Sequence, residues 1–239
     1  MKSNKENALE LLNELKKYIN NRMIVENLET DIEIKYKRIM PKKTSSPLSK
    51  DQLLEKIKKR VFNCKECELY KTKTNYVFGE GSSDAELMFI GEAPGYNEDV
   101  KGKPFVGRAG QLLEKMLNAM GLSREKVFIA NILKCRPPKN RNPQSGEVFA
   151  CTGYLVKQIE VIQPKVICSL GLFAGQFLLD NPMVKMGDIR GGKFEYNGIT
   201  VIPTYHPAYL LRSPSQKKVV WQDMIQVMKL LGMKNKWTE

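Results

Sequence analysis

The sequence is short of several kinds of residue, and each shortage excludes a class of protein. It has no run of about 18 apolar residues, so a membrane-spanning helix is excluded. Its first residues, "MKSNKENALELL", lack the apolar core of a signal peptide. We therefore expect a cytoplasmic protein.

Acidic residues are also in short supply. The chain of 239 residues has 26 Asp and Glu against 39 Lys and Arg, which gives a net charge of +13. This excess suits a polyanionic partner such as nucleic acid or an acidic membrane surface. Lysines scattered over solvated helix faces explain the same excess, so charge alone does not identify the partner.

Histidine and cysteine are scarce as well. His206 is the single histidine, so any imidazole chemistry has to use that residue. Five cysteines in a cytoplasmic chain argue against a disulfide framework and for metal binding or packing. Cys168 lies inside the apolar run "KVICSL", and we expect it to be buried in the core.

The chain divides into an N-terminal extension and one larger domain. Residues 1–48 carry leucines at helical spacing, followed by "MPKKTSSPLSK", which is typical of a linker. Residues 49–239 are enough to bury a full core. We expect a helical extension with a linker over 1–48 and the functional domain over 49–239.

Apolar runs alternate with helix signals in the larger domain. Ser49 is a plausible N-cap for a first helix, and Asn197-Gly198 predicts the turn of a hairpin. Short apolar strands between helices indicate an α/β fold, with a mostly parallel sheet covered on both faces. The expected strands are residues 86–90, 127–133, 165–170 and 199–203, and the expected later helices are 111–120, 144–162, 172–179 and 216–231.

In such sheets, ligands bind beyond the carboxyl ends of the strands. The loops after Ile90, Leu133 and Pro203 all begin at that edge. We therefore expect the functional site where these three loops meet.

Four cysteines are candidates for one metal centre. Cys64 and Cys67 form a C-x2-C pair, and Cys135 and Cys151 follow after 67 and 15 intervening residues. With no histidine nearby, four thiolates suit a zinc site or an iron–sulfur cluster. Spacing does not choose between them, although structural zinc is common. Either centre would join the first helix to the loop after the second strand and act structurally.

The loop after the first strand, "GEAPGYNEDVKGKPFVGRAG", is rich in glycine but does not match a phosphate-binding motif. Its acids, Glu92, Glu98 and Asp99, would repel phosphate, so a neutral ligand, a cation or an activated water suits it better. Phe105 in a glycine-flanked turn predicts a stacking platform for a flat ligand. Ordinary core packing of "PFV" is the alternative.

The other two loops carry polar and basic residues. Asn131 at a strand end can hydrogen-bond donor and acceptor edges, or it can be a simple cap. His206 also lies at a strand end, before "AYLLRS", whose two leucines and arginine predict an exposed wedge that unstacks a base. "KCRPPKNRNP", with Arg136 and Arg141, suits a phosphate backbone unless it is only a solvated loop.

Together these stretches resemble a known family. "GEAPGYNEDVKGKPFVGRAGQLL", "NILKCRPPKNRNP" and "HPAYLLR", with the four cysteines, are similar to the family 4 uracil-DNA glycosylases, the iron–sulfur branch of the uracil-DNA glycosylase superfamily. The similarity runs from about Cys64 to Leu231 in family order. It implies a three-layer α/β/α sandwich with a central four-stranded, mostly parallel sheet. It also implies a [4Fe–4S] cluster rather than zinc, and hydrolysis of the uracil–deoxyribose bond in DNA, leaving an abasic site.

The resemblance also implies residue roles. Phe105 stacks on the flipped uracil, Asn131 contacts its edge and rejects cytosine, and His206 donates to uracil O2. The implied sites are catalytic His206, Glu92 and Glu98; substrate-binding Gly91, Ala93, Phe105 and Asn131; DNA-binding Leu210, Leu211, Arg212, Arg136 and Arg141; and metal-binding Cys64, Cys67, Cys135 and Cys151.

One position departs from the better-known relatives. Those relatives carry an Asp that positions water where this chain has Ala93. Glu92, Glu98 or Asp99 must then hold the water, and the sequence does not choose among them. Glu98 lies where the family places a side chain near the C5 edge of the base, which could exclude the methyl group of thymine.

The implied partner is uracil-containing DNA, single- or double-stranded, bound by a monomer associated with the nucleoid. One branch of the superfamily binds its product covalently through a histidine after the second strand, which this chain lacks. Ordinary turnover is therefore expected. The alternative is a non-catalytic, metal-stapled nucleic-acid-binding protein, which needs no carboxylates in its pocket. The sequence does not identify a partner for residues 1–48.

Overall fold

The computed structural model describes residues 48–234. The expected extension over 1–48, apart from Leu48, lies outside the described residues. Across the described part of the chain, no helix is both long and apolar enough to span a membrane.

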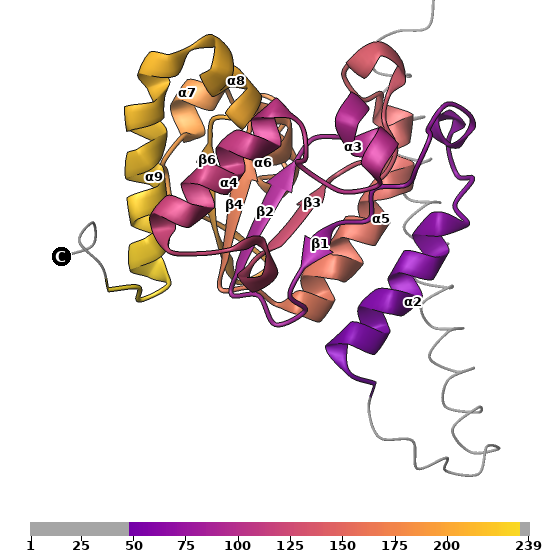
Figure 1. Ribbon diagram of the computed structural model, residues 1–239, viewed down its shortest axis with the longest axis horizontal. Coiled ribbons are helices and arrows are strands. Elements are labelled where there is room, and N and C mark those ends of the chain that lie inside the picture. The colour runs from indigo at the N-terminus through magenta and orange to yellow at the C-terminus, as the bar shows by residue number, and fades with distance from the viewer. Residues whose placement is uncertain (1–47, 235–239) are drawn as a thin grey trace, which may run out of the picture. The chain divides into compact units, whose positions relative to one another are not determined.

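A six-stranded sheet forms the centre of the domain (Figure 1). Its strand order is β1-β3-β2-β4-β6-β5. The four central strands pair in parallel, and the two edge strands, β1 and β5, pair antiparallel to their neighbours. The strands are β1 (Glu80–Gly81), β2 (Leu87–Gly91), β3 (Phe128–Asn131), β4 (Val166–Leu170), β5 (Phe194–Tyr196) and β6 (Ile199–Thr204).

Helices cover both faces of this sheet. The longer ones are α2 (Lys50–Phe62), α4 (Arg108–Met120), α5 (Ser145–Ile162) and α9 (Lys217–Leu230). The shorter ones are α3 (Tyr96–Lys101), α6 (Leu172–Leu178), α7 (Met186–Ile189) and α8 (Pro207–Arg212). The helices α2, α5 and α6 pack on one face of the sheet, and the helices α4, α8 and α9 pack on the other face.

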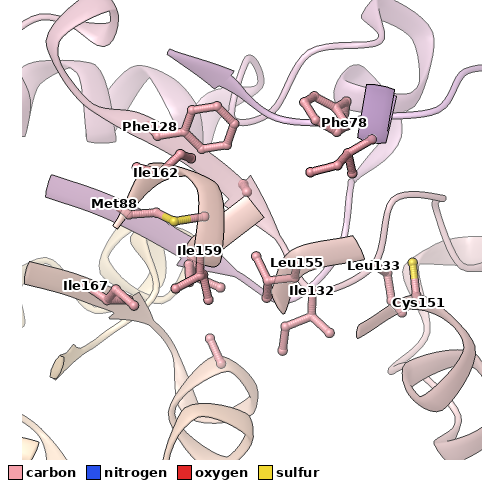
Figure 2. Packing of buried hydrophobic residues seen from close by; sticks show 14 of the residues in the cluster. Phe78, Met88, Phe128, Ile132, Leu133, Cys151, Leu155, Ile159, Ile162 and Ile167 are labelled. Atoms are coloured by element: carbon pink, nitrogen blue, oxygen red, sulfur yellow. The ribbon is translucent and has the colours of Figure 1, made fainter. Parts of the chain in front are cut away.

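The strand β2 shows how the sequence builds two cores. All its residues are buried, and alternate side chains point to opposite faces. Met88 and Ile90 belong to the core under α2, α5 and α6, part of which Figure 2 shows. Leu87 and Phe89 belong to the core under α4 and α9. A strand covered on both faces has to be apolar throughout, which is why "LMFI" shows no alternation.

Most expected elements are confirmed. Ser49 caps α2 in a capping box with Gln52, and the four predicted strands are the central ones. Asn197 and Gly198, both with positive φ, make the turn between β5 and β6. The fold class is thus confirmed, with the antiparallel edge strand β1 and the short helices α3, α7 and α8 missed by the sequence analysis.

Candidate functional site

A cavity of about 500 Å³ opens at the carboxyl edge of the parallel strands. The three predicted loops do meet there. Glu92, Glu98 and Phe105 come from the segment after β2, Asn131 ends β3, and His206 follows β6. Neighbouring strands of a parallel sheet end at the same edge, which brings together residues more than 100 positions apart.

Phe105 holds a strained backbone conformation at this site. Its φ is 51°, in the left-handed region, which costs a non-glycine residue roughly 1–2 kcal/mol. Its ring is buried, and it lies next to His206 with ring centroids 5.5 Å apart. A Cβ on Gly110 would come within 1.8 Å of the Phe105 carbonyl oxygen, so only glycine lets α4 approach this residue.

Gly91 forms the floor beneath the Phe105 ring and the Asn131 amide. A Cβ there would lie 2.4 Å from Asn131 Oδ1 and 2.7 Å from Phe105 Cζ. Gly91 therefore leaves the space in which the two side chains face the cavity.

Asn131 is 2% exposed, and its Oδ1 has no hydrogen-bond partner within the described part of the chain. Leaving a buried acceptor unpaired costs about 1–3 kcal/mol. An amide oxygen held in this way at a cavity favours a ligand that brings an N–H donor.

His206 is the N-cap of α8, and its Nδ1 accepts a hydrogen bond from the Ala208 N–H at 3.0 Å. An accepting Nδ1 places the proton of the neutral ring on Nε2. Burial lowers the pKa of His206 to about 4; Glu98 opposes this shift, and Arg212 adds to it. At neutral pH the ring is therefore an uncharged donor through Nε2.

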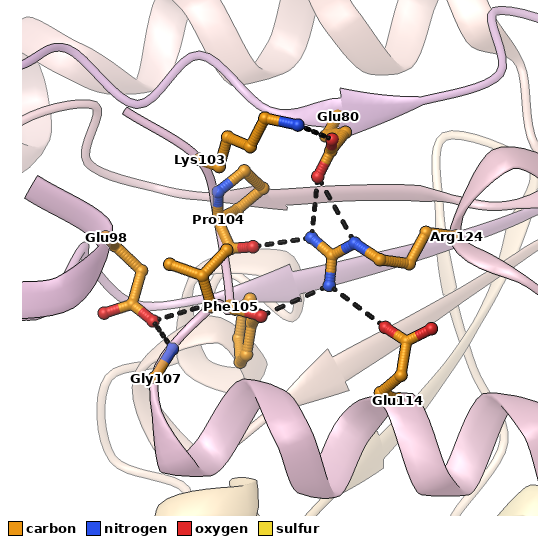
Figure 3. Close-up of polar contacts among 9 residues, drawn as sticks. Glu80, Glu98, Lys103, Pro104, Phe105, Gly107, Glu114 and Arg124 are labelled. Carbon is orange, nitrogen blue, oxygen red and sulfur yellow. Dashed lines mark hydrogen bonds and ion pairs between the residues drawn. The ribbon is translucent and has the colours of Figure 1, made fainter. Parts of the chain in front are cut away.

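The Glu98 carboxylate anchors its own loop. Its Oε1 accepts from the backbone N–H groups of Val106 and Gly107, both at 2.8 Å (Figure 3). Glu98 lines the cavity, but one of its two carboxylate oxygens is occupied by the backbone N–H groups immediately after Phe105.

Asp99 faces away from the cavity. It is 2% exposed, and its Oδ1 accepts from the backbone N–H groups of Thr74 and Asn75 at 2.8 and 3.2 Å. The Asn75 amide returns bonds to the carbonyls of Asp99 and Val100. Asp99 thus ties α3 to the segment after the first cysteine pair. Its inclusion among the candidates for positioning the water was wrong, because it does not line the cavity.

Glu92 is the remaining acid of the loop. It lines the cavity, and burial raises the pKa of its carboxyl group. Among residues 48–234, no hydrogen bond or ion pair engages this carboxylate. Both of its oxygens are therefore available to a water or a ligand.

The two basic residues predicted after β3 have different surroundings. The Arg136 guanidinium lies over the Tyr96 ring, 5.1 Å from its centroid, and its Nε donates to Asn140 Oδ1. Arg141 lines the cavity but forms a two-pronged ion pair with Glu147. Arg141 is consequently less available to a phosphate than a solvated arginine.

The expected wedge is only partly exposed. Leu210 is 1% exposed and packs in the core under α4 and α9, so the prediction of two exposed leucines was wrong for Leu210. One face of α8 packs against the core, whereas Leu211, the residue after Leu210, lies off that face and is 36% exposed. Arg212 is exposed and lines the cavity.

The four predicted metal cysteines, Cys64, Cys67, Cys135 and Cys151, line a second, smaller cavity. Within the described ranges, no three His, Cys, Asp or Glu side chains are close enough to form a ready metal-ion site. Burial raises the pKa of the Cys135 thiol, and nearby Cys151 raises it further. Cys168 is fully buried elsewhere, as predicted.

Sequence reasoning missed two cations near these cavities, of which Lys134 is buried and Arg124 is partly buried. The guanidinium of Arg124 bonds to the carbonyls of Pro104 and Phe105 (Figure 3). Lys134, 1% exposed, donates to the Asn131 carbonyl and to the Gln158 side chain. No spacing signal marks either residue, because each acts on backbone atoms brought close only by the fold.

Comparison with known proteins identifies the family. A sequence model of the uracil DNA glycosylase superfamily matches residues 78–225. A type-4 uracil-DNA glycosylase of Saccharolobus solfataricus is 48% identical over 189 residues, 76% of this chain and 88% of the relative. Those of Archaeoglobus fulgidus and Thermotoga maritima are 46% and 44% identical, over 76% and 74% of this chain and 93–94% of theirs. The chain therefore belongs to the uracil DNA glycosylase superfamily, within its type-4 branch.

Proposed function

We propose that this protein removes uracil from DNA by hydrolysing its N-glycosidic bond, leaving an abasic site for repair. The observation that carries the proposal is the arrangement of three groups in one cavity. A neutral imidazole donor, an aromatic ring and an amide oxygen without a partner come from His206, Phe105 and Asn131. The names of the relatives support the same activity.

Asn131 and Phe105 recognise the base. The free Oδ1 accepts the N3–H of uracil, and the amide nitrogen donates to O4. Cytosine has an acceptor at N3 and a donor at C4, so both contacts become unfavourable. Stacking on the Phe105 ring adds roughly 1–3 kcal/mol without distinguishing the bases.

His206 stabilises the leaving group. When the glycosidic bond breaks, uracil takes up negative charge, chiefly on O2 and O4. The Nε2–H of the neutral ring donates to O2, and its place is fixed beforehand by the bond from the Ala208 N–H to Nδ1. A preorganised donor of this kind contributes about 10²–10³ in rate.

Glu92 positions the attacking water. Glu98 and Asp99 are engaged with backbone N–H groups, whereas the Glu92 carboxylate has both oxygens free in the cavity. A carboxylate there accepts the proton of water as it attacks the sugar and offsets the positive charge that develops on the ring. Ala93, which has no polar side chain, leaves this task to its neighbour.

Double-stranded DNA is contacted by Leu211, Arg212 and Arg136. Flipping a base costs a few kcal/mol, and least for single-stranded or mispaired uracil. Leu211 fills the vacated space, and the two arginines contact phosphates beside the cavity mouth. Leu210 has no part in this contact, because it is buried.

The four cysteines are proposed to hold a [4Fe–4S] cluster. Their donor set is sulfur only, and the four surround one cavity without forming a compact single-ion site, which suits a cluster better than zinc. Lys134, a buried cation with no carboxylate partner in the described residues, donates its backbone N–H to Cys151 Sγ at 3.3 Å. An anionic centre beside Lys134 offsets that buried charge. Such a cluster staples α2 to the segment after β3.

A glycosylase assay tests the proposal. The full chain is incubated with oligonucleotides containing U·G, U·A or single-stranded uracil, without added metal, and free uracil is measured. We expect uracil release and strands that alkali cleaves. Tight DNA binding by folded protein with no uracil release would instead support the non-catalytic binder.

A further inference from the structure

We propose that Arg124 is a positioning residue for Phe105, and that it sets the geometry of the base pocket from outside the cavity. This inference rests on the proposed function, because the ring that Arg124 positions is the one that stacks on uracil. Arg124 is not among the residues that line the cavity, so it acts only through the backbone of its neighbours.

The contacts of Arg124 are directed at the two residues that present the ring. Its Nη2 donates to the Pro104 carbonyl at 2.6 Å, and its Nη1 donates to the Phe105 carbonyl at 3.2 Å. Figure 3 shows the guanidinium spanning both carbonyls from the side opposite the cavity residue Glu98. One planar fork thus fixes the orientation of two consecutive peptide groups.

The backbone that follows Phe105 is also held in place, by Glu98. Glu98 accepts from the N–H groups of Val106 and Gly107, immediately after Phe105. Phe105 itself has a φ of 51°, a conformation that persists only where the surroundings enforce it. A cation on the carbonyls of Pro104 and Phe105 and an anion on the two following N–H groups provide that enforcement.

Arg124 is in turn oriented by acids. Its Nε and Nη2 donate to Glu80 Oε2 at 3.2 and 2.8 Å, and its Nη1 lies 3.6 Å from Glu114 Oε2. The second oxygen of Glu80 accepts from Lys103. The Arg124 side chain is 16% exposed, so its rotamer is fixed before substrate arrives. A lysine cannot reproduce this set, because an ammonium lacks the planar fork.

A double-mutant cycle separates positioning from general stability. Arg124→Met, Phe105→Ala and the double variant are assayed with a single-stranded uracil oligonucleotide, on protein shown to be folded by circular dichroism. We expect Arg124→Met to raise KM about tenfold while kcat changes less, since the misplaced ring loses ground-state stacking. In the Phe105→Ala background the same change should alter KM by less than about twofold.

Two further variants complete the test. Lys103→Met removes a partner of Glu80 but no contact to the ring-bearing turn, and should leave KM unchanged. Arg124→Lys is assayed with Phe105 present and in the Phe105→Ala variant. We expect it to raise KM only where the Phe105 ring is present, so the comparison stands even where Arg124→Met does not fold. Equal effects of the Arg124 change with and without the Phe105 ring, or no effect, overturn the inference. A wild-type chain that releases no uracil contradicts the proposed function instead.

Discussion

The rings of His206 and Phe105 lie 5.5 Å apart with 31° between their planes, although 100 residues separate them in the chain. One ring is the proposed donor to the leaving group, and the other is the proposed stacking platform. Their relative position depends on the parallel pairing of β2, β4 and β6, which brings both segments to one edge of the sheet.

The floor of the pocket gives a prediction about Gly91. Gly91→Ala places a methyl group against Asn131 Oδ1 and the Phe105 ring, so it should raise KM for uracil-DNA at least about tenfold. Gly153→Ala is a matched control. Gly153 is exposed within α5 and has nothing within 4 Å of its added Cβ, so this variant should keep full activity and gain roughly 0.5–1 kcal/mol of stability. Steady-state kinetics and thermal unfolding measure both; unchanged kinetics for Gly91→Ala would argue against the pocket.

The fall in kcat/KM toward acid pH should be caused by protonation of Glu92. Burial raises the pKa of its carboxyl group, so the carboxylate is lost at a higher pH than an ordinary glutamate as pH falls. His206, with a pKa of about 4, is still neutral over that range. We expect kcat/KM to fall toward acid pH in the wild type. Glu92→Gln should lower the rate about 10²–10⁴-fold and flatten this limb.

The control for that experiment is Glu86→Gln. Glu86 is exposed and pairs with Lys165. It precedes the amino end of β2, opposite the carboxyl edge where the cavity opens, and it does not line the cavity. This variant should retain the wild-type profile. An acid limb that survives in Glu92→Gln would assign it to a different group.

Much of this arrangement follows from the sequence, for physical reasons. Strands buried on both faces are apolar throughout, and helices carry caps, so the central sheet and most helices were predicted within a few residues. The three loops at one edge followed from parallel topology. The edge strand β1 has two residues and no apolar pattern, so nothing in the sequence indicated it.

The details of the site depend on side-chain directions that a sequence does not carry. The sequence placed Leu210 and Leu211 together in a wedge, but successive residues of a helix point about 100° apart, and only Leu211 is exposed. Likewise, the three acids of the loop after β2 look equivalent in the sequence. The fold separates them, because Glu98 and Asp99 meet backbone N–H groups and Glu92 does not.

The two leucines offer a paired test. Leu211→Ala should lower activity on double-stranded uracil-DNA several-fold and leave activity on single strands nearly unchanged, because a single strand has no stacked gap to fill. Leu210→Ala should destabilise the fold by about 2–5 kcal/mol through a core cavity. Comparing the two substrates and the unfolding free energies separates the roles. Equal losses on both substrates for Leu211→Ala would contradict a wedge.

The proposed cluster predicts a visible signature. Purified protein should be brown, with the broad visible absorption of an iron–sulfur centre. Cys135→Ala should lose this absorption and much of its stability, whereas Cys168→Ala, which alters a buried cysteine outside the four, should keep the colour. Colourless wild-type protein with stoichiometric zinc would overturn the cluster.

The most direct test of the central claim is single-turnover release of uracil by the wild type and by His206→Ala, with DNA affinity measured alongside. Because the neutral His206 ring is proposed to act on the leaving group, the variant should release uracil about 10²–10³ times more slowly and bind the DNA nearly as well. A folded variant that loses rate and affinity equally, or that retains the wild-type rate, would contradict the account.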